Sequence, residues 1–324
     1  MRVRHCDAYN KVMTKTISTL RLEFTANDVL HVMGATRMAD FLKLVEERTI
    51  GGRERDKGEL AERWRKAAAV FEALQTAEAG QADEVSVLPL SSTLQAHVDK
   101  LIATQYFQDA FAVVPVAFGM VELEKLIVYQ QSIQGATVKK MTEGQSVAMS
   151  DQELADLCLP LSQPPASIRL VNEKNGHFHF VSDSHDARFQ GAQLVKPADV
   201  KGLKINGQSQ AIVALSFGFS TNVLNVVRYG KRMVLNNGHH RALALSQMGV
   251  KYAPCLIQVC GHWEDVGMAG SSEISNNGEL FFSKTRPPLL KDYSNSELTA
   301  IFPVKQATKE IRLNYEIASS YLYL

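Results

Sequence analysis

Two histidines and an arginine follow a glycine at the expected start of a helix, in the segment Gly238-His239-His240-Arg241. The N-terminus of a helix carries roughly half a positive charge, so a cation in its first turn costs about 0.3–1 kcal/mol unless a negative charge offsets it. A phosphate or carboxylate would supply that charge, because free backbone N–H groups and cationic side chains both bind anions. The segment therefore predicts an anion site in which Asn237, Gly238, His239, His240 and Arg241 bind the ligand. Arg241 would clamp it by its charge, and His239 or His240 would act as an acid or base.

A second group of reactive residues lies in the sequence NGHFHFVSDSHDARFQG. His177 and His179 alternate along an expected strand and so project from the same face. With a carboxylate they could bind a transition metal such as zinc, iron or manganese. Asp183 and His185 follow in an expected polar loop, and they would bring a general base to the anion site if this segment folded over the helix. The alternative interpretation is an outward-facing polar hairpin that merely contains histidines.

The elements around the first segment can be read from its pattern. Residues 223–227 and 233–235 have the apolar, β-branched composition of two strands, and a turn containing glycine separates them. Asn237 is suited to be the N-cap of the helix, and Gly249 is suited to its left-handed C-terminal position. Pro254 then opens a buried strand. The segment thus predicts a strand, turn, strand, helix and strand in succession.

This order of elements, with the block GHHRALALSQMGVKYAPCLI, resembles the ParB/sulfiredoxin-like superfamily. That family has a G-x-R-R or G-C-H-R helix followed by an L-G-x-x-x-x-P strand, and residues 121–128 are more weakly similar to its first strand. The resemblance implies a small α/β fold that holds the phosphates of a nucleotide such as ATP or CTP, with Mg²⁺. A reactive cysteine occupies the position of His239 in the sulfiredoxin branch, so the resemblance does not extend to thiol chemistry.

Composition limits the class of protein. The chain has 324 residues, of which 45% are hydrophobic and 21% charged, and its net charge is +1. This balance is ordinary for a globular protein, and it gives no support to a broadly basic surface for nucleic acid. Cysteines at four positions, mostly far apart, favour free thiols in the cytoplasm over a disulfide framework. No apolar run approaches the ~20 residues that a membrane span needs, so we expect no membrane association.

We expect a mixed α/β (α+β) fold. Residues 1–85 are predicted to form a helical N-terminal region, with residues 27–47 as one helix, and the acidic residues 78–84 are predicted to form a linker. Residues 86–324 would form the ParB/sulfiredoxin-like domain, with an inserted hairpin at about 162–217 and a C-terminal helical extension over 297–323. Tyrosines in that extension could pack on another subunit, so oligomer formation stays open.

Three functions are compatible with these patterns. The first is binding of a nucleotide or another phosphate ligand, with hydrolysis or transfer of phosphate as its extension. The second is a metal-dependent hydrolase or nuclease that uses His177, His179, Asp183 and His185. The third is a non-enzymatic regulator or scaffold. The signatures of P-loop NTPases, dinucleotide-binding enzymes, serine hydrolases and HExxH metalloproteases are absent from the sequence.

Overall fold

The computed structural model shows a mixed α and β fold, as the sequence predicts. The chain forms two compact units: unit 1 comprises residues 1–161 and 222–305, and unit 2 comprises residues 162–221 and 306–324. The structure describes residues 22–25, 27–143, 149–163, 167–174, 176–184, 186–202 and 207–322.

Unit 2 begins at the residue where the insertion was expected, but residue 85 is no boundary between compact units. The expected linker at 78–84 lies inside unit 1. Within it, Glu78 pairs with Arg286 at 2.9 Å and with Lys291 at 2.7 Å, and Asp83 pairs with Arg232 at 2.8 Å. The acidic side chains of this segment are therefore counter-charges for buried arginines, which explains why an acidic stretch is not a solvated linker.

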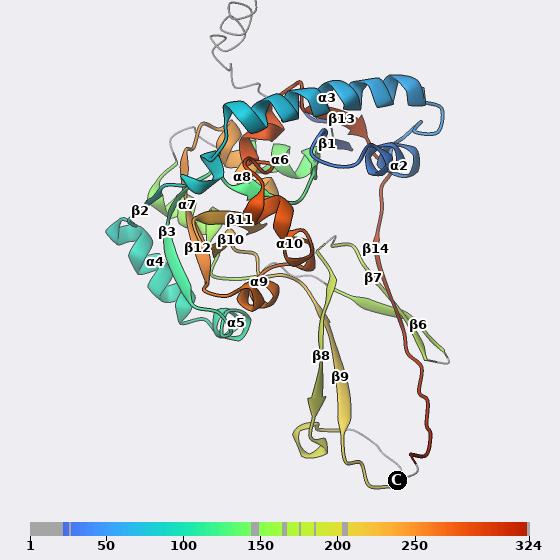
Figure 1. Ribbon diagram of the computed structural model, residues 1–324. Coiled ribbons are helices and arrows are strands. Elements are labelled where there is room, and N and C mark those ends of the chain that lie inside the picture. The colour runs from blue at the N-terminus through green and yellow to red at the C-terminus, as the bar shows by residue number, and fades with distance from the viewer. Residues whose placement is uncertain are drawn as a thin grey trace, which may run out of the picture. The chain divides into compact units, whose positions relative to one another are not determined.

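A six-stranded sheet forms the centre of unit 1 (Figure 1). In order across the sheet the strands are β2 (Val87–Leu88), β3 (Val116–Glu122), β12 (Tyr252–Cys260), β10 (Asn225–Tyr229), β11 (Arg232–Asn237) and β4 (Ile127–Val128). Strand β10 pairs antiparallel with β11 and parallel with β12, and β11 pairs parallel with β4. Strand β12 pairs antiparallel with β3.

Apolar side chains on both faces of this sheet are buried. Val226 and Leu235 belong to one cluster, whereas their neighbours Val227 and Val234 belong to a second, because successive side chains of a strand point to opposite faces. Helices α4 (Ser92–Ile102), α5 (Gln105–Ala110), α7 (Asp151–Cys158) and α8 (His239–Gln247) contribute to the first cluster. Helices α9 (Trp263–Ala269) and α10 (Ser272–Asn276), with the short helices Gln81–Asp83 and Glu279–Ser283, contribute to the second.

A smaller sheet in unit 1 joins distant parts of the chain. Its strands, in the order β13, β1, β5, are Thr299–Pro303, Asp28–Val32 and Ser132–Gln134. Helices α2 (Met38–Arg48) and α3 (Lys57–Ala77) pack beside it through Phe41, Phe71 and Phe302 (Figure 1), and α6 (Gly135–Thr142) follows β5. No helix in the described ranges, α3 included, is both long and apolar enough to cross a membrane.

The helical prediction for residues 27–47 is wrong in part, and the one for 297–323 is wrong over all its described residues. Residues 28–32 and 299–303 form the paired strands β1 and β13, and residues 309–314 form a strand of unit 2. In that last strand Ile311 and Leu313 alternate with the polar Glu310, Arg312 and Asn314, which is the period of a strand and not of a helix. The C-terminal extension is therefore not helical over these residues.

Unit 2 is built from antiparallel strands. Its three-stranded sheet has the order β14 (Lys309–Asn314), β7 (His177–Ser182), β6 (Arg169–Lys174), and a separate hairpin consists of β8 (Arg188–Val195) and β9 (Ile212–Gly218). Phe217 of the hairpin contacts Phe180 of the sheet, with 4.5 Å between ring centroids. This aromatic contact gives the two-stranded hairpin apolar support within the unit.

Candidate functional site

The anion site predicted from the sequence lies where β11 passes into α8. Gly238, with φ of 94°, is the N-cap, so the prediction that Asn237 is the N-cap is wrong. Asn237 instead accepts a hydrogen bond from the Gly238 N–H through its Oδ1 at 2.7 Å. A Cβ at position 238 would lie 2.7 Å from Leu224 Cδ1, so both the backbone angle and the space require glycine. The helix begins with no side-chain cap and no acidic residue in its first turn.

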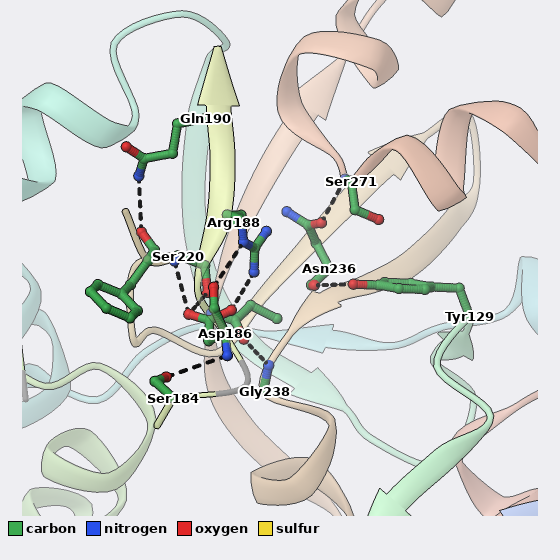
Figure 2. Close-up of polar contacts among 11 residues, drawn as sticks. Tyr129, Ser184, Asp186, Arg188, Gln190, Ser220, Asn236, Gly238 and Ser271 are labelled. Carbon is green, nitrogen blue, oxygen red and sulfur yellow. Dashed lines mark hydrogen bonds and ion pairs between the residues drawn. The ribbon is translucent and has the colours of Figure 1, made fainter. Parts of the chain in front are cut away.

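A polar network holds the end of β11 just before the helix. The parallel strands β4 and β11 end side by side, and Tyr129, just after β4, donates its hydroxyl to the Asn236 carbonyl at 3.1 Å. The Asn236 side chain accepts a hydrogen bond from the Ser271 N–H at 3.0 Å (Figure 2). It also donates to the Ala269 carbonyl at 3.1 Å. The strand end that leads into α8 is therefore held in place on both its main chain and its side chain. Sequence reasoning missed this network because its members come from three separate segments.

His239 is buried beneath the helix start, with 3% of its surface exposed. Its ring meets the Tyr129 ring edge-on at 4.8 Å between centroids. Among the described residues, its Nε2 atom has no hydrogen-bond partner. Burial, assisted by the neighbouring His240, lowers the pKa of His239 to about 3. At neutral pH its imidazole is therefore uncharged, so it can hydrogen-bond a ligand but cannot deliver a proton from an imidazolium.

His240 reaches a second helix start. Its Nε2 accepts a hydrogen bond from the backbone N–H of Gln134 at 3.1 Å, and Gln134 is the N-cap of α6. Helix α6, like α8, has neither a side-chain cap nor an acidic residue in its first turn. The positive ends of two helices are thus brought together through His240.

Arg241 is buried beside the same helix start, with 5% of its surface exposed. Its Nη2 donates to Asn222 Oδ1 at 2.7 Å, and its Nη1 lies 3.5 Å from the Cys158 carbonyl oxygen. Its Nε has no hydrogen-bond partner in the described part of the chain. Nη1 also lies 3.6 Å from the point where a Cβ of residue 238 would stand. The guanidinium therefore lies against the glycine that opens the helix.

The surroundings of Arg241 provide no full negative charge. No carboxylate of the described residues forms an ion pair with it, and its ionisable neighbours are the thiols of Cys158 and Cys255. Burial raises the pKa of Cys158 to about 12 and that of Cys255 well above its ordinary value, so both thiols are neutral at physiological pH. The same burial lowers the pKa of the guanidinium itself.

The second group of predicted residues lies in unit 2. His177 and His179 do share a face of β7, where His177 Nδ1 lies 2.5 Å from Asn314 Oδ1 and His179 Nε2 lies 2.6 Å from Glu310 Oε1. Asp183 is exposed, and His185 lies outside the described residues. Within the described ranges no three histidine, cysteine or acidic side chains are grouped to hold a metal ion. The meeting of Asp183 and His185 with His239 and His240 stays a prediction.

Asp186 has a structural role that the sequence did not indicate. Its Oδ2 accepts hydrogen bonds from the Ser220 N–H at 2.8 Å and the Ser220 hydroxyl at 2.5 Å, and its Oδ1 accepts from Arg188 (Figure 2). These contacts join the two ends of the β8–β9 hairpin. The charge of Arg188 is consequently compensated by Asp186.

No protein-family model, curated protein or solved structure matches this chain. The chemistry of the site must therefore be inferred from its geometry. That geometry comprises two helix starts without side-chain caps, a neutral buried imidazole, and a buried guanidinium with no acidic partner in the described part of the chain.

Proposed function

We propose that the start of α8 binds the phosphate group of a small ligand. The observation that carries this proposal is the environment of Arg241 compared with that of the other buried arginines in the described chain. Arg286, 0% exposed, pairs with Asp292 and Glu78, and Arg232, 8% exposed, pairs with Asp83. Arg241 is buried to the same degree, and no carboxylate of the described residues pairs with it.

An unpaired buried charge is unfavourable, because the effective cost of removing an ion from water is several kcal/mol. The Cys158 carbonyl at the C-terminal end of α7 offsets part of this cost, since the last carbonyls of a helix carry partial negative charge. A bound phosphate would offset the rest. It would also satisfy the Nε donor that has no partner among the described residues.

The helix starts favour phosphate as the anion. Each start has backbone N–H groups without an intrahelical partner, and a phosphate offers enough oxygens to accept from several donors at once. Gly238 leaves the backbone open to close approach. Neutral His239 would add a hydrogen bond from its ring. We therefore assign the phosphate to Gly238, His239, His240 and Arg241.

The resemblance of residues 238–257 to the ParB/sulfiredoxin-like superfamily supports a nucleotide as the carrier of this phosphate, with ATP or CTP and Mg²⁺ as the first ligands to test. Hydrolysis or transfer would need a stronger base than His239, whose pKa is about 3, and the candidates are His240, Asp183 and His185. Release of inorganic phosphate from a bound nucleotide would measure that extension separately from binding.

The test is a thermal-shift titration of the full chain with inorganic phosphate, ATP and CTP, each with and without Mg²⁺. A ligand at 100 times its dissociation constant adds about 2.7 kcal/mol of stability, which is readily measured. Arg241→Lys keeps the positive charge but loses the planar fork, so we expect at least one of these compounds to stabilise the wild type and to bind the variant about tenfold more weakly. Arg232→Lys is the matched control, because it alters a buried arginine that has its own carboxylate.

Two results would contradict the proposal. One is a folded Arg241→Lys protein with undiminished affinity, and the other is a wild type that none of these phosphate compounds stabilises. A rise in the unfolding temperature with Zn²⁺ or Mn²⁺ alone would instead support a metal site at His177 and His179.

A further inference from the structure

Arg241 contacts both places where the chain passes between the units. The chain leaves unit 1 after Leu161 and returns to it at Asn222. Arg241 Nη2 holds Asn222, and Nη1 lies against the carbonyl of Cys158, just before the outgoing crossing. The same Cys158 carbonyl accepts a hydrogen bond from the Leu224 N–H at 2.7 Å. One guanidinium and one carbonyl therefore connect the outgoing and returning chain.

We infer that Arg241 couples the phosphate site to these crossings, so that ligand binding at the start of α8 tightens the returning crossing at residues 222–224. This inference rests on the proposed function. Beyond binding a ligand, the site would then regulate how tightly residues 222–224, where the chain returns from unit 2, are held in unit 1.

The arrangement of donors on Arg241 gives the direction of the effect. Nη2 is directed to Asn222, whereas Nη1 lies near Gly238 and Nε has no partner in the described structure. A phosphate that accepts from Nε would lie on the edge formed by Nε and Nη2, because these N–H groups point the same way, and Nη2 has a second N–H for Asn222. Because the guanidinium is planar and rigid, fixing this edge on a phosphate also fixes the nitrogen that holds Asn222.

The effect is expected at the returning crossing more than at the outgoing one. The outgoing chain has further supports: His97 Nε2 lies 2.7 Å from the Leu159 carbonyl oxygen, and the Tyr106 hydroxyl donates to the Pro160 carbonyl at 2.5 Å. Helices α4 and α5, which carry these side chains, hold that segment independently of Arg241. The returning chain has a support in the sheet as well, since the Leu224 carbonyl accepts from the Leu256 N–H at 3.0 Å. The Asn222 side chain and the Leu224 amide, however, bond to Arg241 and to the Cys158 carbonyl that Arg241 contacts, so the effect is expected there.

Coupling of this kind is reciprocal, since a ligand that tightens the crossing must bind more weakly when the crossing is loosened. Asn222→Ala removes the amide that Arg241 holds without removing any group assigned to the phosphate. We expect this variant to bind the ligand about fivefold more weakly, at the low end of typical couplings. Asn277→Ala is the matched control, because it removes one exposed side-chain hydrogen bond elsewhere in unit 1 and should leave the affinity unchanged.

Hydrogen exchange of the full chain tests the inference directly. Amides of residues 222–224 should exchange about fivefold more slowly in saturating inorganic phosphate or ATP than without ligand. Amides of the β10–β11 ladder, such as that of Val234, should not respond. In Arg241→Lys without ligand, the Leu224 amide should exchange faster than in the wild type, and phosphate should no longer slow it.

The outcomes separate this inference from the proposed function. If phosphate or ATP stabilises the protein through Arg241 but exchange at 222–224 is unchanged, the coupling is wrong and the ligand site stands. If none of the phosphate compounds binds, the proposed function fails and the ligand-dependent coupling fails with it. Unchanged Leu224 exchange in ligand-free Arg241→Lys would overturn the structural link itself.

Discussion

Arg286 and Asp292 share two hydrogen bonds, of 2.5 and 2.6 Å, in the interior of unit 1, where neither side chain is more than 2% exposed. Glu78 adds a further ion pair to the same guanidinium. Hydrogen bonds and charges from both carboxylates outweigh the effect of burial and hold the pKa of Arg286 above its usual range. The contact joins the end of α3 to residues 286–292, which are more than 200 residues away in sequence.

Asp292→Ala should be strongly destabilising, because it leaves Arg286 buried with only Glu78 as counter-charge. Breaking a buried pair from one side costs about 3–5 kcal/mol. The comparison is Asp40→Ala, which removes an exposed pair with Arg37 and should cost far less, because solvent screens exposed charges. Urea unfolding measures the free energy of unfolding of both variants. Equal losses in the two would contradict the prediction that the buried pair contributes more stability than the exposed one.

Gly238→Ala should cost more than Gly249→Ala. Both residues have positive φ, 94° and 81°, so alanine is strained at either position. A Cβ would meet nothing within 4 Å at 249, whereas at 238 it would meet Leu224 at 2.7 Å. We expect about 1 kcal/mol of lost stability at 249 and about 2–3 kcal/mol at 238, together with loss of phosphate-dependent stabilisation at 238 only. Equal losses of stability would mean that Leu224 moves aside without cost.

Stability should fall as the pH drops below 6.5, partly because of His31. Burial lowers the pKa of His31 to about 4, and its Nδ1 lies 2.8 Å from the Ser132 hydroxyl oxygen. In the unfolded chain this histidine takes up a proton near pH 6.5, and in the folded chain it does so only near pH 4. The contribution of neutral, buried His31 to the free energy of unfolding is therefore fully present above pH 6.5. It is lost as the pH falls from 6.5 to 4, where the free energy of unfolding decreases by about 3 kcal/mol.

His31→Asn should reduce this pH dependence, because the asparagine side chain does not titrate between pH 6.5 and 4. Unfolding in urea at a series of pH values is the measurement. A slope between pH 6.5 and 4 that is the same in wild type and His31→Asn would contradict the assignment.

Phe217→Ala should loosen the β8–β9 hairpin while leaving unit 1 unaffected. Phe217 packs on Phe180 of the three-stranded sheet and on Phe189 of its own hairpin, and a two-stranded hairpin without such support is marginal in water. Hydrogen exchange should accelerate in β8 and β9 and stay unchanged in β10 to β12. Val213→Ala, at a position 67% exposed, is the control and should have little effect on either set.

Local signals were sufficient to predict the elements around the site. The succession of β10, β11, α8 and β12 was predicted within a few residues, because Gly249 and the turn at Gly230 have the positive φ that only glycine adopts easily. Strands β1 and β13 could not be predicted in this way. The two strands pair with each other, and paired residues such as Leu30 and Ile301 lie about 270 residues apart in sequence. A short apolar run such as either of them can also belong to a helix or to a strand.

The same limit applies to the site itself. The sequence indicated that His239, His240 and Arg241 start a helix, but not which of them would be buried. That outcome depends on Tyr129, Gln134 and Asn222, which reach the helix start from other segments. The sequence did not indicate the buried Arg286 network either. One of its carboxylates, Glu78, lies 208 residues before the arginine, and the other, Asp292, lies six residues after it.

The pairing of β1 with β13 has a consequence for synthesis on the ribosome. Strand β1 is made early, but its neighbour β13 emerges only after almost all of unit 1 and the inserted part of unit 2 have been translated. At roughly 5–20 residues per second, this leaves one edge of β1 unpaired for some tens of seconds. Nascent chains stalled before residue 299 should therefore expose that edge to chaperones, whereas chains released after residue 305 should not.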